Sequence, residues 1–447
     1  MSIPAYPEYK ESGVPWLGQI PTHWEPVRFK NLLRERDQRS VDGSEELLSV
    51  SAYTGVRPKS ESTADGEFAS RAESLEGYKV CKQGDLVMNI MLAWNRGLGV
   101  TQFDGIVSPA YCVFNLGNGL HAPFFDYAAR ADEYTGYYKA HSSGVIDSRL
   151  RLYPDKFGAL QFAKPRLEEQ QAIATFLDRE TAKIDALVAE QERLIALLKE
   201  KRQAVISHAV TKGLDPDAPM KDSGIEWLGE IPAHWETGRL GQLTTKIGSG
   251  KTPSGGAEIY VDEGVLFLRS QNIYDEGIEL REIVRIPKAI DEEMRSTRVS
   301  AGDILLNITG ASLGRTCLFD GLDEPANVNQ HVCIIRLASF DRLKFVAMAL
   351  KSSRTKAQID SSQNGAAREG LNFAQIARLT IALPPTDEAT SIVAEIHEQT
   401  EALDRLANDA KTAIDLLQER RAALISAAVT GKIDVRGLVE QHEMEAA

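Results

Sequence analysis

The glycine-rich stretch Gly248 to Ser254, GSGKTPS, is the part of the sequence that comes nearest to a catalytic motif. A phosphate-binding loop of the form G-x4-G-K-[ST] requires glycine where this chain has Thr245, and Pro253 follows the motif directly. We therefore predict that no ATP site is present here. A glycine loop with one lysine suits close approach to another backbone, such as that of DNA, and an ordinary surface turn explains it equally well.

The remaining motifs give no catalytic constellation. The stretch Leu383 to Thr386, LPPT, lacks the polar and aromatic ends of an adenine-methyltransferase box, and the patterns GxGxxG, HExxH and GxSxG do not occur. His23 and His234 have no second metal ligand at a useful spacing, so we predict a structural role for both. The four cysteines show no CxxC pairing, which favours buried free thiols, no metal site and a cytoplasmic, reducing location.

Two long helices are predicted to position everything else. Residues 166–211 contain neither Gly nor Pro, and Pro165 and Gly213 flank them as a helix start and stop would. Apolar residues follow a heptad frame, and the same frame recurs in the second half of the chain. In the first helix the frame comprises Ile173, Leu177, Ile184, Leu187, Leu194, Leu198 and Val205; in the second it comprises Ile392, Ile396, Leu403, Leu406, Ala413, Leu417 and Leu424. We expect the two helices to pack against each other along this frame.

The repetition extends beyond the helices. The segment KESGVPWLGQIPTHWEPVRF near the N-terminus is answered by KDSGIEWLGEIPAHWETGRL from Lys221 onward, and the helix ends KEKRQAVISHAVT and QERRAALISAAVT also match. Between them, GDLVMNI (84–90) is answered by GDILLNI (302–308). The chain is therefore predicted to be two copies of one unit, each made of a WLG-x-IP-x-HW motif, a globular block and a long helix.

The globular blocks combine short apolar runs with turn residues, which predicts several strands, and one helix is expected in each block, at 124–141 and 340–353. The fold class is therefore α+β: two mixed α/β domains joined by two long antiparallel coiled-coil helices, with an internal duplication and pseudo-two-fold symmetry. The net charge is −13. Most of the acidic excess lies in residues 386–447, which argues against non-specific binding of nucleic acid by bulk charge and leaves room for a local basic cleft. No apolar run approaches the length of a membrane span.

The doubled WLG motif and the doubled helix ending VIS-x-AVT or LIS-x-AVT resemble the specificity (S) subunits of type I DNA restriction–modification systems. The segments Gly97 to Tyr111 and Leu383 to Ile392, and LEEQQAI at the start of the first long helix, are also similar to that family; the second helix departs with Glu388 and Ala389 at the corresponding place. The resemblance covers essentially the whole chain. It implies target recognition domain 1 at 1–165, a central helix at 166–212, a linker at 213–220, target recognition domain 2 at 221–385, a C-terminal helix at 386–431 and a tail at 432–447.

The resemblance further implies a chain without its own activity or cofactor. Each recognition domain would read one half of a bipartite double-stranded DNA site, and the two long helices would pack antiparallel and act as a spacer. Two methyltransferase subunits, which use S-adenosylmethionine, and restriction subunits, which use ATP and Mg, would be the partners.

Base-edge contacts are expected from loops with Arg, Lys, Asn, Gln or Ser/Thr side chains. The candidates are Arg57, Lys59, Asn95, Arg96 and Arg149 in the first block, and Lys251, Thr252, Gln271, Asn272, Arg315 and Arg368 in the second. Arg202 and Arg421 recur at matching places that the heptad frame does not include, so we predict that they contact the methyltransferase subunits. The main alternative is a coiled-coil interaction scaffold that never binds nucleic acid; a self-sufficient methyltransferase or nuclease is disfavoured by the absent motifs.

Overall fold

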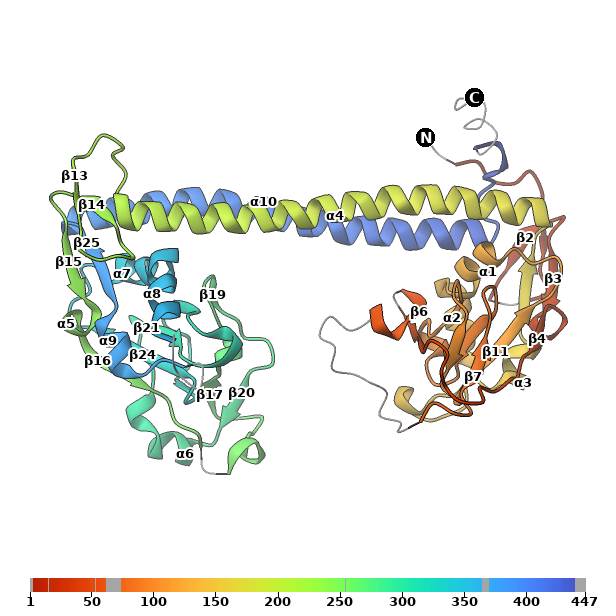
Figure 1. The fold of residues 1–447 in the computed structure, drawn as a ribbon, viewed down its shortest axis with the longest axis horizontal. Helices are drawn as coiled ribbons and strands as arrows, with labels where there is room; N and C mark the ends of the chain where they lie inside the picture. The colour runs from red at the N-terminus through yellow and green to blue at the C-terminus, as the bar shows by residue number, and fades with distance from the viewer. Residues whose placement is uncertain are drawn as a thin grey trace. The chain divides into compact units, whose positions relative to one another are not determined.

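The computed structural model describes residues 3–14, 16–52, 54–61, 74–253, 255–363 and 370–438. The chain divides into two compact units, residues 1–191 with 412–447, and residues 192–411. Both boundaries fall inside the long helices, α4 (Leu167–Lys212) and α10 (Thr386–Val429), which run through both units (Figure 1). Each unit therefore consists of one globular block and one half of each long helix.

The first unit contains a four-stranded antiparallel sheet of order β4-β11-β8-β9 and four two-stranded ladders, β1-β2, β3-β12, β5-β6 and β7-β10. Its strands are β1 (Tyr9–Glu11), β2 (Gln19–Pro21), β3 (Glu25–Arg28), β4 (Leu33–Glu35), β5 (Leu48–Ser51), β6 (Gly55–Pro58), β7 (Lys79–Cys81), β8 (Leu86–Asn89), β9 (Leu98–Val100), β10 (Gly105–Val107), β11 (Tyr111–Leu116) and β12 (Gln161–Lys164). Its short helices are α1 (Ala122–Ala129), α2 (Asp132–His141) and α3 (Pro154–Ala159).

The second unit repeats this plan with a sheet of order β16-β24-β21-β22 and adds a three-stranded sheet, β20-β17-β23. Its strands are β13 (Met220–Asp222), β14 (Glu230–Pro232), β15 (Glu236–Arg239), β16 (Thr244–Ser249), β17 (Val265–Leu268), β18 (Ile273–Tyr274), β19 (Gly277–Ile278), β20 (Val284–Ile286), β21 (Asp303–Asn307), β22 (Thr316–Phe319), β23 (Ala326–Val328), β24 (Val332–Leu337) and β25 (Thr380–Leu383). Its short helices are α5 (Leu240–Leu243), α6 (Lys288–Glu293), α7 (Leu343–Lys351), α8 (Ser353–Gln363) and α9 (Phe373–Arg378).

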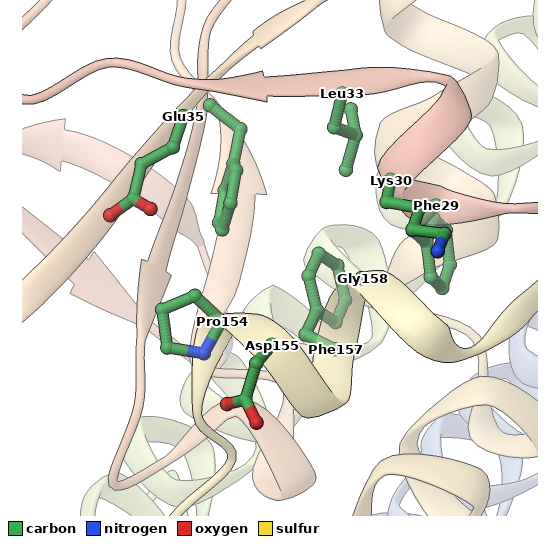
Figure 2. Close-up of a pocket in the computed structure, with 9 residues that line it drawn as sticks. Phe29, Lys30, Leu33, Glu35, Pro154, Asp155, Phe157 and Gly158 are labelled. Carbon is green, nitrogen blue, oxygen red and sulfur yellow. The ribbon is translucent and has the colours of Figure 1, made fainter.

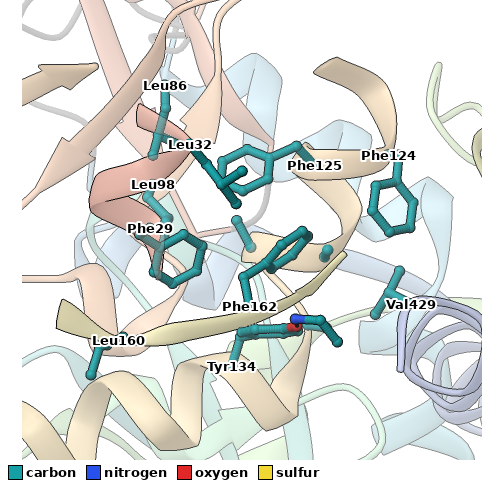
Figure 3. Packing of buried hydrophobic residues seen from close by; sticks show 14 of the residues in the cluster. Phe29, Leu32, Leu86, Leu98, Phe124, Phe125, Tyr134, Leu160, Phe162 and Val429 are labelled. Atoms are coloured by element: carbon teal, nitrogen blue, oxygen red, sulfur yellow. Dashed lines mark hydrogen bonds between the residues drawn. The ribbon is translucent and has the colours of Figure 1, made fainter. Parts of the chain in front are cut away.

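Aromatic side chains fill the core of the first unit. Phe29 stacks on Phe157 with ring centroids 4.6 Å apart, and Phe162 packs against Phe125 at 5.3 Å. Figure 3 shows Phe29, Phe125 and Phe162 close together, with Val429 of α10 at the edge of the same cluster. Burying one such side chain stabilises a fold by about 1.5–3 kcal/mol. The end of a long helix is therefore an integral part of the core.

The two helices pack antiparallel within each unit. Asp185 of α4 pairs with Arg421 of α10 in the first unit, and Arg202 of α4 pairs with Asp404 of α10 in the second. The residue numbers rise along one helix as they fall along the other, which is the antiparallel arrangement that the sequence predicts.

The predicted packing frame is wrong in the middle of the helices. Leu187, Leu194 and Leu406 are 52%, 39% and 51% exposed, whereas buried or half-buried residues follow one another in steps of four and three. In α4 they are Leu177, Thr181, Ile184, Val188, Gln191, Ile195, Leu198, Arg202 and Val205; in α10 they are Ile396, Thr400, Leu403, Ala407, Ala410, Ile414, Leu417, Arg421 and Leu424. The prediction followed the leucines, but polar and β-branched residues occupy several buried positions, and the leucines beside them face outward.

Among the described residues, no helix combines the length and the apolar character that a membrane span requires. The four cysteines are buried and free. Burial raises the pKa of Cys81, Cys317 and Cys333 to about 12 and that of Cys112 to about 11. The thiolate is the reactive form of cysteine, so these side chains are chemically inert in the folded chain.

Candidate nucleic-acid interface

One end of each four-stranded sheet carries a set of polar loops. In the second unit, the C-terminal end of β16, the N-terminal end of β24 and the turn between β21 and β22 meet there, because Ser249 pairs with Cys333 and Leu306 pairs with both Cys333 and Thr316. In the first unit, Asn89 pairs with Tyr111 and Met88 with Leu98, which brings the β8–β9 loop to the corresponding end. Antiparallel pairing thus gathers loops that lie far apart in the sequence.

In the first unit, three of the predicted contact residues lie around helix α2. Asn95 and Arg96 lie in the β8–β9 loop, where Arg96 has a left-handed backbone (φ 58°) and forms an ion pair with Asp132 at the start of α2. Lys139 of α2 lies 5.0 Å from the Trp94 ring in the same loop, and its Nζ is 2.9 Å from Oδ2 of Asp147. Asp147 begins the short helix that ends at the exposed Arg149.

The other two predicted residues of this unit lie on a separate hairpin. Arg57 is on β6, where its guanidinium lies 5.9 Å from the Phe103 ring, and Lys59 follows in the next turn. The structure therefore groups Asn95, Arg96 and Arg149 around α2 and places Arg57 and Lys59 with β6.

In the second unit, Lys251 and Thr252 are exposed just beyond β16. The preceding Gly250 lies so close to the β23–β24 turn that an added Cβ would be 1.9 Å from the Val328 carbonyl oxygen, and its N–H donates to the Val332 carbonyl at 3.1 Å. This glycine is therefore needed for packing against the chain itself.

Gln271 is exposed, and its Nε2 lies 3.5 Å from Oε2 of Glu282. Arg315 is half-buried in the β21–β22 turn, with its guanidinium 4.8 Å from the Tyr274 ring. Both side chains belong to the same group of loops, because Asn307 at the end of β21 donates through Nδ2 to the Ser270 carbonyl at 2.8 Å.

The structure contradicts Asn272 as a contact residue. It is 1% exposed. Its Nδ2 donates to the carbonyls of Glu279 and Arg281 at 2.9 and 3.2 Å, and its Oδ1 accepts from the Arg269 backbone at 3.0 Å. An amide whose polar atoms already bond to the backbone holds a turn and cannot also reach a base. Arg368 lies outside the described residues.

Sequence reasoning missed several side chains at these sheet ends. Trp94 and Lys139 belong to the group around α2. In the second unit, His331 in the β23–β24 turn lies with Nδ1 2.6 Å from Oγ1 of Thr309 and Nε2 2.8 Å from Nε2 of Gln330. The run Asn-Gln-His just before a buried strand was a signal in the sequence, because three polar side chains in a strand connection suit hydrogen bonding to a ligand.

Each of the repeated histidines connects the globular block of its own unit to a long helix through a glutamate. His23 Nε2 lies 2.8 Å from Oε2 of Glu169 in the first turn of α4, and the buried Glu169 also accepts from Tyr6 Oη at 2.7 Å and Trp24 Nε1 at 3.1 Å. His234 Nε2 lies 2.7 Å from Oε2 of Glu388 in the first turn of α10. Both histidines therefore have the structural role predicted, and no group of three or more His, Cys, Asp or Glu in the described ranges is arranged to hold a metal ion.

A cleft of about 490 Å³ opens elsewhere on the first unit, lined by Phe29, Leu33, Phe114 and Phe157, with Lys30, Glu35 and Asp155 also on its walls (Figure 2). Figure 2 shows Glu35 and Asp155 on different elements, a strand and a short helix. Its wall is mainly aromatic and aliphatic, and none of the predicted contact residues lines it. The loops at the sheet ends, rather than this cleft, therefore form the candidate nucleic-acid interface.

Arg202 and Arg421 are not at free helix surfaces as predicted. Both occupy the buried face between the helices, with Nε 3.1 Å from Oδ1 of Asp404 and 3.3 Å from Oδ1 of Asp185, respectively. A half-buried arginine that pairs with the neighbouring helix fixes the register of the pair, so recurrence of the two arginines is explained without a partner protein. Their predicted contact with a methyltransferase is not needed to account for them.

The chain thus contains two repeated α/β blocks and two long helices, and it is similar to several known proteins. Residues 232–424 match the family model of the type I restriction modification DNA specificity domain. The EcoBI specificity subunit of Escherichia coli is 25% identical over 290 residues, covering 63% of this chain and 60% of that protein. The EcoKI specificity subunit of E. coli strain K12 is 21% identical over 357 residues, covering 76% and 70%.

Among solved structures, a chain described under "Structural basis underlying complex assembly and conformational transition of the type I R-M system" aligns with a TM-score of 0.63 over 93% of this chain and 99% of that one. At 15% sequence identity this likeness shows a shared fold. The chain is therefore similar to type I restriction–modification specificity subunits, and its residues 232–424 match the DNA specificity domain of these systems. Its match spans about three-fifths of the EcoBI subunit.

Proposed function

We propose that this chain is the non-catalytic DNA sequence-specificity subunit of a type I restriction–modification complex. The observation that carries the proposal is the duplication itself: a DNA specificity domain matches residues 232–424, and the first unit repeats the same sheet, hairpin and helix order with its own set of polar loops. Each of the two recognition domains would read one half of a bipartite target.

The loop side chains are chemically suited to reading duplex DNA. Arginine and lysine recognise guanine edges in the major groove, and glutamine and asparagine recognise adenine. Arg149, Lys251, Gln271 and Arg315 provide these groups, while Trp94 and Tyr274 support nearby cations through their rings. With both globular blocks close to neutral in sequence, such a local group of cations supports specific contact rather than general attraction to DNA.

The long helices would act as the spacer between the two readers and as the docking surface for two methyltransferase subunits. Each helix is continuous, and six leucines on them are exposed: Leu167, Leu187, Leu194, Leu197, Leu406 and Leu416. Exposed leucines on a helix pair suit contact with further helices. In this proposal S-adenosylmethionine, ATP and Mg belong to the methyltransferase and restriction subunits, this chain binds none of them, and the complex is cytoplasmic.

A scaffold that binds partner proteins but no nucleic acid is the second candidate, and the net charge of −13 favours it. To separate the two, the chain would be purified with its methyltransferase and incubated with a randomised duplex library, and bound DNA would be recovered by gel shift. A specificity subunit enriches one defined sequence pattern. A scaffold captures the methyltransferase equally well and enriches no sequence, and that result would refute the proposal.

A further inference from the structure

A small pocket of about 260 Å³ lies in the second unit, where the last turn of α4 meets the first turn of α8. Three basic side chains line it, His208 and Lys212 from α4 and Arg354 from α8, together with the hydroxyl groups of Ser207 and Thr211. Within the described ranges, no carboxylate lies within ion-pair distance of Lys212 or Arg354, and His208 has no hydrogen-bond partner. The pocket therefore concentrates positive charge without an acidic partner.

The hydroxyl groups of Ser207 and Thr211 can each donate a hydrogen bond to a ligand. Ser207 Oγ accepts two hydrogen bonds, from the Ser353 backbone N–H at 2.8 Å and from Gln203 Nε2 at 3.1 Å, so its own proton is available to a ligand. Thr211 is only 3% exposed, and its hydroxyl has no side-chain hydrogen bond among the described residues, although the residue lines the pocket. This hydroxyl is therefore available to a ligand in the pocket.

The first unit contains the same arrangement with the opposite sign. Ser426 of α10 and Thr430, which follows the end of that helix, correspond to Ser207 and Thr211. Glu133, the second residue of α2, corresponds to Arg354, the second residue of α8. There the chain supplies its own anion, because Ser426 Oγ donates to the Glu133 carboxylate and Lys432 Nζ lies 3.5 Å from Oε1 of the same group. Thr430 Oγ1 donates to the Ser426 carbonyl at 2.7 Å.

Helix electrostatics explain Lys212 but not Arg354. Cations are favourable in the last turn of a helix and unfavourable in the first, each by about 0.3–1 kcal/mol. Arg354 stands in the first turn of α8 and beside two other basic groups, whereas Glu133 is favourable in the same position of α2. Where the first unit supplies its own carboxylate, the second unit lacks an anion.

We propose that this pocket binds a phosphate group, held by Lys212 and Arg354 and by the hydroxyls of Ser207 and Thr211. The bound group would take the place that the Glu133 carboxylate has in the first unit. A backbone phosphate of DNA and a free phosphate ion share this chemistry. Binding of the free ion does not depend on the proposed reading of DNA, so the two ideas can fail separately.

The test converts the second unit to the pattern of the first. In Arg354→Glu the new carboxylate can pair with Lys212 and accept from Ser207, so we expect this variant to be folded and to unfold at a higher temperature than the wild-type chain in chloride buffer. Inorganic phosphate at matched ionic strength should raise the unfolding temperature of the wild-type chain. It should leave that of Arg354→Glu unchanged, with phosphate affinity by calorimetry lowered about tenfold or more.

Lys288→Glu is the matched control, because it makes the same change from cation to anion at the exposed first residue of another helix, α6, away from the pocket. It should keep the full response to phosphate. The salt dependence of DNA binding shows which phosphate occupies the pocket. If it is a DNA phosphate, the slope of the logarithm of the binding constant against the logarithm of the salt concentration decreases in magnitude by about 1 in Arg354→Glu. If it is a free ion, this slope is the same in the variant and in the wild type. An equal phosphate response in wild type and Arg354→Glu, or none in the wild type, would overturn the proposal.

Discussion

The two units are built on one plan, yet they satisfy it with different chemistry. In the first unit the Glu169 carboxylate is buried and gathers Tyr6, His23 and Trp24, and a second carboxylate, Glu133, completes the contact between α2 and α10. In the second unit Glu388 is more exposed and bonds to His234, and Trp235 Nε1 is buried without a partner in the described part of the chain. Backbone pairing and core packing therefore maintain the fold that the two units share, while the polar contacts differ between the two copies.

Removing the carboxylate at the start of each long helix should show the largest difference between the units. Glu169→Ala leaves the buried Tyr6 hydroxyl and Trp24 N–H without an acceptor, which should lower the free energy of unfolding by about 3–5 kcal/mol. Glu388→Ala removes one exposed pair and should cost less than about 1 kcal/mol. Chemical denaturation of both variants measures the two free energies of unfolding. Equal losses would mean that the contacts of Glu169 and Glu388 contribute equally to stability.

Changing Trp24 or Trp235 to phenylalanine compares the two units at a second pair of corresponding residues. Trp24→Phe removes a bond to a buried carboxylate, whereas Trp235→Phe removes an N–H that has no partner. Both create a similar small cavity, so Trp24→Phe should be the more destabilising by about 1–3 kcal/mol. The unfolding free energies of the two variants give this difference directly, and a larger loss for Trp235→Phe would contradict the assigned hydrogen bonds.

The two arginine–aspartate pairs between the helices should give the smallest effect. Each pair is partly open to solvent, so a double-mutant cycle on Arg202 and Asp404 should give a coupling energy of about 0.5–1 kcal/mol. Arg421 is more exposed than Arg202, and its pair with Asp185 should couple more weakly. A stronger coupling for the Arg421 pair would reverse this order and show that exposure does not set the strength of these contacts.

The repeat and the heptad spacing predicted the long helices well, because a run without Gly or Pro and with one apolar face has few alternative structures. The predicted ranges 166–212 and 386–431 compare with Leu167–Lys212 and Thr386–Val429 in the structure. Which residues face the partner helix was harder to predict. Spacing alone favours large leucines, whereas burial is decided by the antiparallel register, and that register places Thr181, Arg202 and their counterparts inside.

Local breaks and side-chain partners also escaped prediction. The helix expected at 124–141 is two helices, because Ala131 adopts an extended backbone between α1 and α2. Asn272 had the right residue type for a base contact, but its amide completes a turn made by residues that follow it in the chain. Residue type indicates what a side chain can bind, whereas only the fold indicates whether its polar atoms are already used.

The central claim is that each unit reads its own half of a DNA site. The direct measurement is selection of bound duplexes from a randomised library by the complex of this chain with the proposed methyltransferase subunits. It would be made for the wild-type chain, for alanine at Arg57, Lys59, Asn95, Arg96 and Arg149, and for alanine at Lys251, Thr252, Gln271 and Arg315. Each lost base contact relaxes discrimination by about 1–3 kcal/mol.

We predict that the wild-type complex selects two defined half-sites separated by an unread gap, and that each variant relaxes one half-site and retains the other. Selection of a single uninterrupted sequence, or loss of both half-sites together in either variant, would contradict the account.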